Sequence, residues 1–492
     1  MLDTITDLKS LLKDASLLPS KAYIAGEWVE AADGARFAVT NPARGDVIAY
    51  VPDLTRADAA RAIAAADVAR REWAARTGKE RAQIMRRWFD LCMAAQDDLA
   101  AILTAEMGKP LAEAKGEIAY GSSYIEWFAE EAKRAYGEVI PGHMRDKRIQ
   151  VIKQPIGVCA SITPWNFPNA MIARKVAPAL AAGCAMVSRP AAETPLSALA
   201  LAVLAERAGV PGGVFSVITS SRASDIGREF CENPAVRKLT FTGSTEVGRI
   251  LLRQAADKVL KCSMELGGNA PFIVFDDADL DAAVEGAMVS KFRNNGQTCV
   301  CANRIYVQSG VYDAFAAKLA KAVEKLAIGD GLVSGVTTGP LINMDAVAKV
   351  EEHIADVLAG GGAVVTGGAR HALGGTYFQP TVVTGVRPDM KVAQEETFGP
   401  LAPLFRFDTE EEVIKLANDT IFGLASYFYA RDIGRITRVQ EGLEYGMVGV
   451  NTGLISNEMA PFGGVKQSGL GREGSHHGMD DYMEMKYICL SV

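Results

Sequence analysis

Several residue patterns that mark particular protein classes are missing from this chain of 492 residues. Its five histidines form no HExxH motif and its eight cysteines form no CxxC motif, so we expect no structural metal site. The cysteines also lack the spacing of a disulfide framework, which favours a reducing, cytoplasmic location. With a net charge of −7 and no long basic block, the chain is not expected to bind nucleic acid.

Long apolar runs are missing as well. The most apolar windows, 177–187 and 198–204, are interrupted by Gly, Pro or charge, and they are shorter than the roughly 20 residues of a membrane-spanning helix. The first 20 residues mix aspartates with lysines, and no arginine precedes Arg36. They therefore resemble neither a secretory signal nor a transit peptide. We expect a soluble protein without a membrane partner.

The chain does have enough length and apolar content for more than one core. At 49% hydrophobic residues, two or three domains are expected. From residue 156 onward, short β-branched runs such as GVCASIT and KLTFTG alternate with helical runs such as ARKVAPALAAG. This alternation predicts βαβ units around a parallel sheet that is buried on both faces. A second alternation begins after Glu265 and predicts a second α/β domain.

The N-terminal part is expected to be helical, and two other segments are expected to be edge strands. Thr55 and Asp58 form an N-cap signature before an alanine-rich helix, and a further helical run covers 79–107. The segment 146–156 and the C-terminal DYMEMKYICL alternate in polarity, as edge strands do. Exposed edges of this kind either carry charge as protection or pair with another subunit.

The segment 294–304, NNGQTCVCANR, contains the best candidate for a nucleophile. Cys299 follows a Gly-Gln-Thr turn, so its thiol can face a cleft, although a lone cysteine is more often a small buried hydrophobe. Further motifs are MELGGNAPF with Glu265, TPWNFP with Asn166, EETFGP with Glu396, and APFGGVKQSG near the C-terminus. Together these motifs resemble the aldehyde dehydrogenase superfamily, over a stretch from about Ile24 to the last residues.

The resemblance implies a particular α/β fold. It has a Rossmann-like cofactor domain, an α/β catalytic domain and a small oligomerisation β-sheet. The corresponding segments of this chain are 1–137 and 157–265 for the cofactor domain, 266–470 for the catalytic domain, and 138–156 and 481–492 for the oligomerisation strands. The resemblance also implies a homo-oligomer, either a tetramer or a dimer.

The resemblance assigns three catalytic roles. A nucleophile must first make the aldehyde carbon tetrahedral, and a thiolate at Cys299 suits this because it forms a thiohemiacetal and then a thioester. The Asn166 amide and the Cys299 backbone N–H would stabilise the oxyanion, each such donor being worth roughly 3 to 4 kcal/mol. Glu265 would activate the water that hydrolyses the thioester. Without the family, these residues would be a buried thiol, a turn residue and a loop carboxylate.

The predicted cofactor site is spread over several segments. FTGSTEVGR, 241–249, follows a predicted strand and opens a helix, so its N–H groups and the Ser244 hydroxyl suit a pyrophosphate, although the pattern is not GxGxxG. Glu396 and Phe398 match the residues that hold the nicotinamide ribose and ring in the family. The complete predicted set is Thr163, Pro164, Trp165, Ser188, Arg189, Ala192, Gly243, Ser244, Gly248, Leu266, Glu396 and Phe398.

Two of these positions indicate which dinucleotide is preferred. In NAD-preferring relatives a Glu binds the adenine ribose hydroxyls and repels a 2′-phosphate, whereas this chain has Ala192 there. The neighbouring Arg189 replaces the usual Lys and can bind a phosphate bidentately. We therefore expect NADP to be preferred, with NAD possible. Glu193, Ser220 and Ser221 leave a relaxed NAD site as the alternative.

Two arginines indicate the substrate. Arg174 and Arg293 stand where many relatives have apolar side chains, and desolvating two guanidiniums beside a cysteine is costly unless an anion binds. With Ser456 they resemble the carboxylate clamp of the succinate-semialdehyde dehydrogenase branch, so the expected reaction is oxidation of succinate semialdehyde to succinate. Glutarate semialdehyde, one methylene longer, stays open because a methylene is worth only about 1 to 3 kcal/mol. A structural salt bridge is the alternative for either arginine.

Cys301 is a candidate for redox regulation. In some members of this branch the equivalent CxC pair forms a reversible disulfide, and strained pairs of this kind are readily reduced. The alternative is an ordinary second thiol. The alternative functions are a CoA-acylating enzyme and a non-catalytic binding protein. Glu265 argues against a CoA-acylating enzyme, and the intact set of Cys299, Glu265 and Asn166 argues against a non-catalytic binding protein.

Overall fold

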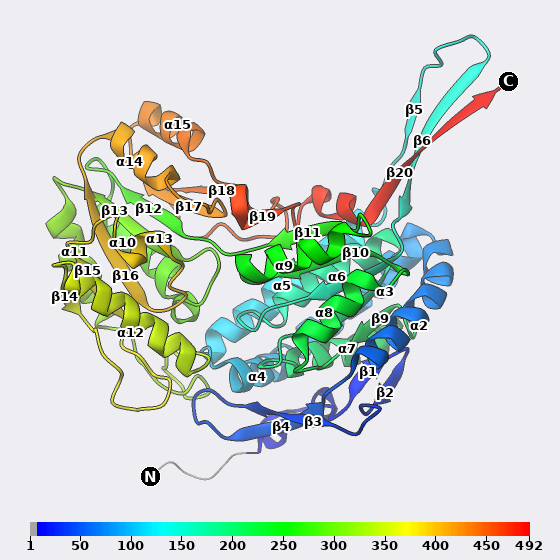
Figure 1. Ribbon diagram of the computed structural model, residues 1–492, viewed down its shortest axis with the longest axis horizontal. Coiled ribbons are helices and arrows are strands. Elements are labelled where there is room, and N and C mark those ends of the chain that lie inside the picture. Colours follow the sequence, from blue (N-terminus) through cyan, green and yellow to red (C-terminus); the bar gives the residue numbers. More distant parts are fainter. Residues whose placement is uncertain (1–6) are drawn as a thin grey trace.

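The protein folds into two α/β units and a sheet that projects away from them (Figure 1). The computed structural model describes residues 7–492, so the first six residues of the segment predicted to be neither a signal nor a transit peptide lie outside the description. Within 7–492, none of the helices combines the length and the apolar character needed to cross a membrane.

The first unit surrounds a mixed sheet whose central strands are parallel. In spatial order the strands are β19 (Gly469–Leu470), β11 (Lys261–Glu265), β10 (Val236–Thr242), β7 (Val158–Ile162), β8 (Ala185–Arg189), β9 (Phe215–Val217), β1 (Ala22–Ile24) and β2 (Glu27–Val29). The β-branched runs form fully buried strands because helices cover both faces of the sheet.

Two groups of helices enclose this sheet. One face packs against α2 (Arg56–Ala75), α8 (Ala223–Glu232) and α9 (Thr245–Ala256). The other packs against α3 (Gly78–Ala94), α4 (Gln96–Met107), α5 (Leu111–Glu131), α6 (Ala170–Ala182) and α7 (Leu196–Ala208). Thr55 and Asp58 form the predicted capping box at the start of α2. A short helix α1 (Leu8–Leu11) and the hairpin of β3 (Arg36–Thr40) and β4 (Val47–Pro52) complete this part of the chain.

The second unit has a sheet that is parallel except at one edge. Its strands lie in the order β14 (Ala363–Thr366), β15 (Thr381–Thr384), β16 (Leu401–Phe407), β13 (Ala302–Gln308), β12 (Ala270–Val274), β17 (Ala425–Tyr429) and β18 (Met447–Val450). One face packs against α10 (Leu280–Phe292) and α11 (Tyr312–Val323). The other packs against α12 (Met344–Ala359), α13 (Lys391–Gln394), α14 (Glu410–Asn418) and α15 (Ile433–Gly442).

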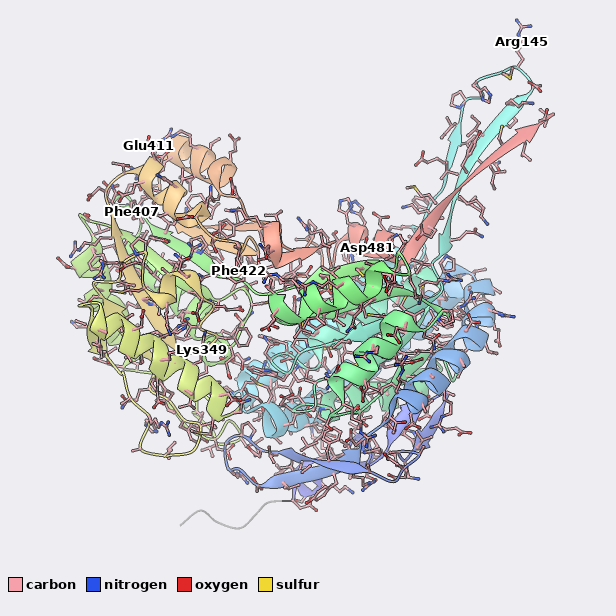
Figure 2. The ribbon with its side chains drawn as sticks, viewed as in Figure 1. Arg145, Lys349, Phe407, Glu411, Phe422 and Asp481 are labelled. Carbon is pink, nitrogen blue, oxygen red and sulfur yellow. The ribbon has the colours of Figure 1, made fainter. Side chains whose placement is uncertain are left out.

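The projecting sheet consists of β5 (Glu138–Ile140), β6 (Lys147–Pro155) and β20 (Met483–Ser491). Figure 2 shows Arg145 at its tip and Asp481 at its base. The segment 146–156 was predicted as an edge strand, but β6 is the central strand of this sheet, with β5 and β20 on its two sides. Alternating polarity indicates that the two faces of a strand have different surroundings. It does not indicate how many neighbouring strands pair with that strand.

One further prediction needs correction. The helical run 79–107 is two helices, because Ala95 leaves helical geometry and Asp97 and Asp98 open a new N-terminus, which favours acidic residues. β19, which the predicted catalytic domain includes, pairs with β11 of the first sheet. The α/β fold itself is as predicted, whereas the domain boundaries stay a prediction.

Candidate active site

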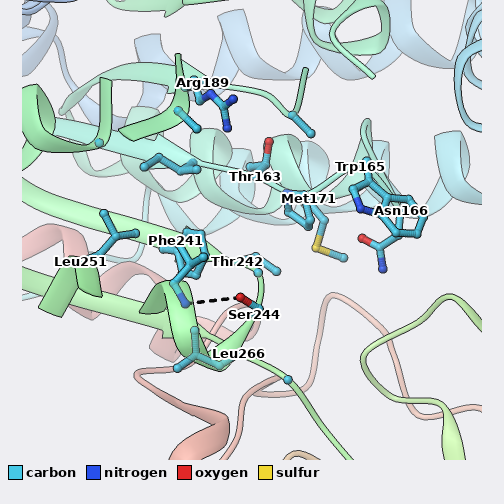
Figure 3. Close-up of a pocket in the computed structure, with 18 of the residues that line it drawn as sticks. Thr163, Trp165, Asn166, Met171, Arg189, Phe241, Thr242, Ser244, Leu251 and Leu266 are labelled. Atoms are coloured by element: carbon cyan, nitrogen blue, oxygen red, sulfur yellow. Dashed lines mark hydrogen bonds between the residues drawn. The ribbon is translucent and has the colours of Figure 1, made fainter. Parts of the chain in front are cut away.

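A cavity of about 690 Å³ lies at the carboxyl ends of the central strands of the first sheet. Thr163, Arg189 and Thr242 come from the ends of β7, β8 and β10, while Cys299 and Glu396 reach it from the second unit. Figure 3 shows Leu251 at one end of this cavity and Asn166 at the other.

Most of the predicted cofactor residues line this cavity. They are Thr163, Pro164, Trp165, Arg189, Gly243, Ser244, Leu266, Glu396 and Phe398. The other three predicted residues do not line it. The Ser188 hydroxyl lies within the sheet, 2.6 Å from the Ser161 hydroxyl, Gly248 packs against Leu266, and the cavity wall passes from Ala191 to Glu193 without Ala192.

One wall of the cavity was not predicted from the sequence. This wall consists of Ala223, Ser224 and Gly227 on α8 and Val247, Ile250, Leu251 and Gln254 on α9. The two helices are amphipathic, and nothing in their sequence distinguishes residues that line a cavity from residues of an ordinary helix.

Arg189 has the features of an anion-binding residue. Its Nη2 donates to the Ser220 carbonyl oxygen at 2.9 Å, which fixes the direction of the guanidinium. Its Nε is buried and has no hydrogen-bond partner in residues 7–492. A buried donor without a partner is costly, so this atom favours a ligand acceptor at the cavity wall.

Cys299 lies where the large cavity meets a smaller one. Burial raises the pKa of the Cys299 thiol to about 12, and the positive charge of Arg174 opposes this shift. The resting thiol is therefore neutral at physiological pH, and its proton must be removed before the sulfur can act as a nucleophile.

The loop before Cys299 is held in an uncommon conformation. Asn294 and Asn295 both have left-handed backbone angles, with φ of 52° and 55°. The Asn294 side-chain amide donates to the Asn166 carbonyl oxygen at 3.0 Å, and its backbone N–H donates to Glu113 at 2.8 Å. Such backbone strain costs of order 1 to 3 kcal/mol and persists only where surrounding contacts hold it.

Asn166, the predicted oxyanion donor, lines the large cavity together with Cys299. Its Nδ2 donates to the Gln297 carbonyl oxygen at 3.0 Å, and because an amide nitrogen has two hydrogens, one N–H remains for a ligand. The backbone carbonyl oxygen of Asn166 accepts a hydrogen bond from the buried Lys109 ammonium group at 2.8 Å. Lys109 also forms an ion pair with Glu117 at 2.6 Å. The loop around Asn166 is thus fixed from inside the protein.

Glu265 ends β11 and is buried without lining the large cavity. Neither of its carboxylate oxygens has a hydrogen-bond partner in the described part of the chain. Burial raises the pKa of Glu265 well above its usual range, and the negative charge of Glu473 adds to this shift. The ionised form of Glu265 is therefore disfavoured relative to that of an exposed carboxyl, and only this form can act as a base.

The smaller cavity brings the predicted substrate residues together. Arg174, Arg293 and Ser456 line it with Cys299, and so do Tyr120, Phe167, Met171, Thr298, Val300 and Phe462. Arg174 is buried and forms an ion pair with Glu473 at 2.6 Å, which is the structural salt bridge considered as the alternative. Tyr120 was not predicted, because it lies in a helix without a motif.

Arg293 differs from Arg174 in its partners. It forms no ion pair with any residue from 7 to 492, and its guanidinium lies 5.3 Å from the centre of the Phe167 ring. The charge of Arg293 is therefore available to an anionic ligand beside Cys299.

Cys301 is a free, fully buried thiol. Its Sγ donates to the Lys291 carbonyl oxygen at 3.4 Å, and it lines neither cavity. The predicted regulatory disulfide with Cys299 is not formed in this state and stays a prediction.

Comparison of the whole sequence with known protein families gives one family. The model of the aldehyde dehydrogenase family matches residues 28–488. The chain belongs to the aldehyde dehydrogenase family. This aldehyde dehydrogenase is 66% identical over 97% of its length to a glutarate-semialdehyde dehydrogenase of Pseudomonas aeruginosa, 99% of which is covered. It is 64% identical over 98% of its length to the NADP(+) succinate-semialdehyde dehydrogenase GabD of Escherichia coli, all of which is covered.

A third relative and a solved structure are equally similar. A 3-sulfolactaldehyde dehydrogenase of Pseudomonas putida is 65% identical, with 97% of this chain and 98% of that protein covered. The crystal structure of succinate-semialdehyde dehydrogenase from Burkholderia pseudomallei has a TM-score of 0.97 and 66% identity, with 98% of this chain and all of that chain covered. The fold of this aldehyde dehydrogenase is therefore the fold of its family.

Proposed function

We propose that this aldehyde dehydrogenase oxidises succinate semialdehyde to succinate, with NADP as the preferred cofactor and NAD possible. The observation that carries the proposal is Arg293, a guanidinium without an ion-pair partner in residues 7–492 that lines the same small cavity as Cys299. An aldehyde with a carboxylate at its far end would pair with this charge, and the relatives named above act, by their names, on aldehydes that carry a carboxylate or a sulfonate.

The chain's own residues support a covalent mechanism. The Cys299 sulfur, once deprotonated, adds to the aldehyde carbon and forms a thiohemiacetal. The free N–H of the Asn166 amide donates to the resulting oxyanion, a contribution of roughly 3 to 4 kcal/mol. Loss of a hydride from this carbon leaves a thioester on Cys299. Glu265, in its ionised form, then removes a proton from the water that hydrolyses the thioester.

A dinucleotide fits the large cavity. Its 690 Å³ is within the range of cofactor sites. Arg189 would hold a 2′-phosphate, the unpartnered Nε supplying a donor, while Glu396 and Phe398 would hold the nicotinamide ribose and ring. When bound, the nicotinamide supplies the acceptor for the hydride. Burial raises the pKa of Glu396 to about 8, so a ribose hydroxyl near it meets a carboxyl that titrates close to neutral pH.

Glutarate semialdehyde is the second candidate substrate. The relative at 66% identity is named for it, and it presents the same carboxylate one methylene farther from the aldehyde. We propose it as a slower substrate, because one methylene changes binding by only about 1 to 3 kcal/mol.

We further propose that the enzyme is a cytoplasmic homo-oligomer, a tetramer or a dimer. The free state of its cysteines supports a reducing compartment. The projecting sheet exposes Val139, Met144, Met485 and Tyr487, with exposed fractions from 59% to 84%, and an apolar surface of this kind favours an interface. The segments 1–137 with 157–265, 266–470, and 138–156 with 481–492 are proposed as cofactor, catalytic and oligomerisation domains.

Steady-state kinetics would test the substrate proposal. Absorbance at 340 nm is followed with succinate semialdehyde, glutarate semialdehyde and butanal, each with NADP and with NAD. The proposal predicts the highest kcat/KM for succinate semialdehyde with NADP. Equal kcat/KM for butanal would overturn the role of Arg293, and a strong preference for NAD would overturn the role of Ala192.

A further inference from the structure

Helix α12 packs directly against the loop that carries Glu396 and Phe398. Lys349, labelled in Figure 2, and Val350 lie on its contacting face. A methyl group at Gly399 of the loop would overlap the Val350 side chain, so the helix and the loop backbone are in close contact. The loop residues Glu396 and Phe398 line the large cavity on the other side.

One histidine of α12 binds the loop at two points. His353 is fully buried. Its Nδ1 lies 3.0 Å from the Thr397 hydroxyl, and its Nε2 lies 3.3 Å from a Glu395 carboxylate oxygen. Glu395 also forms an ion pair with Lys349. The two bonded residues, Glu395 and Thr397, are the immediate neighbours of Glu396.

The chemistry of the partners defines the state of the imidazole. A carboxylate only accepts hydrogen bonds, so Nε2–H donates to Glu395 and the unprotonated Nδ1 accepts from the Thr397 hydroxyl. One neutral tautomer therefore satisfies both bonds. Burial and the nearby charge of Lys349 lower the pKa of His353, which keeps the ring neutral.

The loop needs this support because its geometry is strained. Phe398 has a left-handed backbone with φ of 54°, uncommon for an aromatic residue. Its ring meets Trp165 edge to face at 5.5 Å, and Glu396 accepts from the Gly268 N–H at 3.2 Å. Strained backbone persists only where its surroundings hold it, and the bond from Thr397 to His353 is adjacent to the strained residue.

We propose that His353 is a positioning residue, which holds Glu396 and Phe398 in the orientation that binds the nicotinamide half of the dinucleotide. The inference rests on the proposed NADP-dependent function and extends it to a residue outside the cavity. His353 does not touch the substrate residues or Cys299; its effect is on cofactor binding and on hydride transfer.

The test compares His353→Ala, His353→Asn and Thr397→Val with wild type and with the control His371→Ala, which alters a half-buried histidine of the same unit. The Kd of NADPH is measured from its fluorescence, and the alkylation rate of Cys299 by iodoacetamide is measured without cofactor. We expect His353→Ala and Thr397→Val to raise the Kd about tenfold, the effect of about 1.4 kcal/mol. His353→Asn retains an acceptor for Thr397 and recovers most of the affinity. The alkylation rate stays within about twofold, the scale of a small electrostatic change.

Further outcomes distinguish failure of the His353 inference from failure of the proposed function. Wild-type Kd in both His353→Ala and Thr397→Val would overturn the inference. An equal loss of Cys299 alkylation would also overturn it, because it would indicate general damage. If His353→Ala does not fold, Thr397→Val and His353→Asn decide the question in the same assays. If wild type binds NADPH but does not oxidise succinate semialdehyde, the proposed function fails, whereas the Kd values still test the role of His353.

Discussion

Arg174 and Glu473 form a buried ion pair, with Nη2 of the arginine 2.6 Å from Oε2 of the glutamate. Glu473 also pairs with Lys175. Although burial alone would raise it, these two cations hold the pKa of Glu473 below its usual range. The ionised form of one carboxyl group near the site is thus stabilised, whereas the ionised form of Glu265 is disfavoured. Environments that separate two carboxyl pKa values in this way often assign different roles to the two groups.

The two predicted substrate arginines differ in their charge partners: Arg174 pairs with Glu473, whereas Arg293 has no ion-pair partner in residues 7–492. Arg293→Gln should raise KM for succinate semialdehyde at least about 30-fold, the low end of the 2 to 5 kcal/mol for losing one partner of a buried charge pair. Its kcat/KM for butanal should change little. Arg174→Gln should lower Tm markedly and reduce activity on both aldehydes, because it leaves Glu473 with fewer partners. An equal loss on butanal for Arg293→Gln would contradict this division.

The pH dependence of turnover should reflect Glu265. Its pKa is raised, so the base form appears only as the pH rises, and kcat should increase with pH along a limb well above pH 4.5. Glu265→Gln should remove the base and slow thioester hydrolysis by roughly 10² to 10⁴. Stopped-flow absorbance should then show a burst of about one NADPH per active site followed by a slow phase. A Glu265→Gln enzyme with wild-type steady-state kcat would be incompatible with the role.

Much of the fold and site was predictable because the signals are local. The capping box at Thr55 and the β-branched runs of the first sheet depend on neighbouring residues. The Glu473 partner of Lys175 is 298 residues away, and no spacing rule connects them. The sequence does not predict that Tyr120 and the wall formed by α8 and α9 line the cavities. Their positions there depend on tertiary packing of helices with other parts of the chain. The central position of β6 likewise depends on tertiary pairing.

Cofactor choice should change with two substitutions. Ala192 does not line the cavity itself, but it lies between Ala191 and Glu193, which do, so we expect the longer side chain of Ala192→Glu to bring a carboxylate to the cavity. This substitution should raise KM for NADP at least about tenfold through like-charge repulsion, while KM for NAD falls. Arg189→Gln should weaken NADP and leave NAD nearly unchanged, because only NADP carries the 2′-phosphate. The measurement is kcat/KM for both dinucleotides at saturating aldehyde. Parallel losses for NAD and NADP would refute a phosphate-binding role for Arg189.

Cys301 should protect Cys299 against peroxide. Peroxide converts the Cys299 thiolate to a sulfenic acid, and the Cys301 thiol can condense with it to a disulfide with release of water. Wild type should lose activity and recover with dithiothreitol, whereas Cys301→Ala should lose activity irreversibly at a lower peroxide dose. Irreversible loss at the same dose for both proteins would leave Cys301 as an ordinary buried thiol.

The covalent role of Cys299 is tested most directly by Cys299→Ala. This enzyme, assayed at 340 nm with succinate semialdehyde and NADP, should form no NADPH, in the burst or in steady state, while binding NADPH with the wild-type Kd. Formation of NADPH at the wild-type rate by Cys299→Ala would contradict the mechanism.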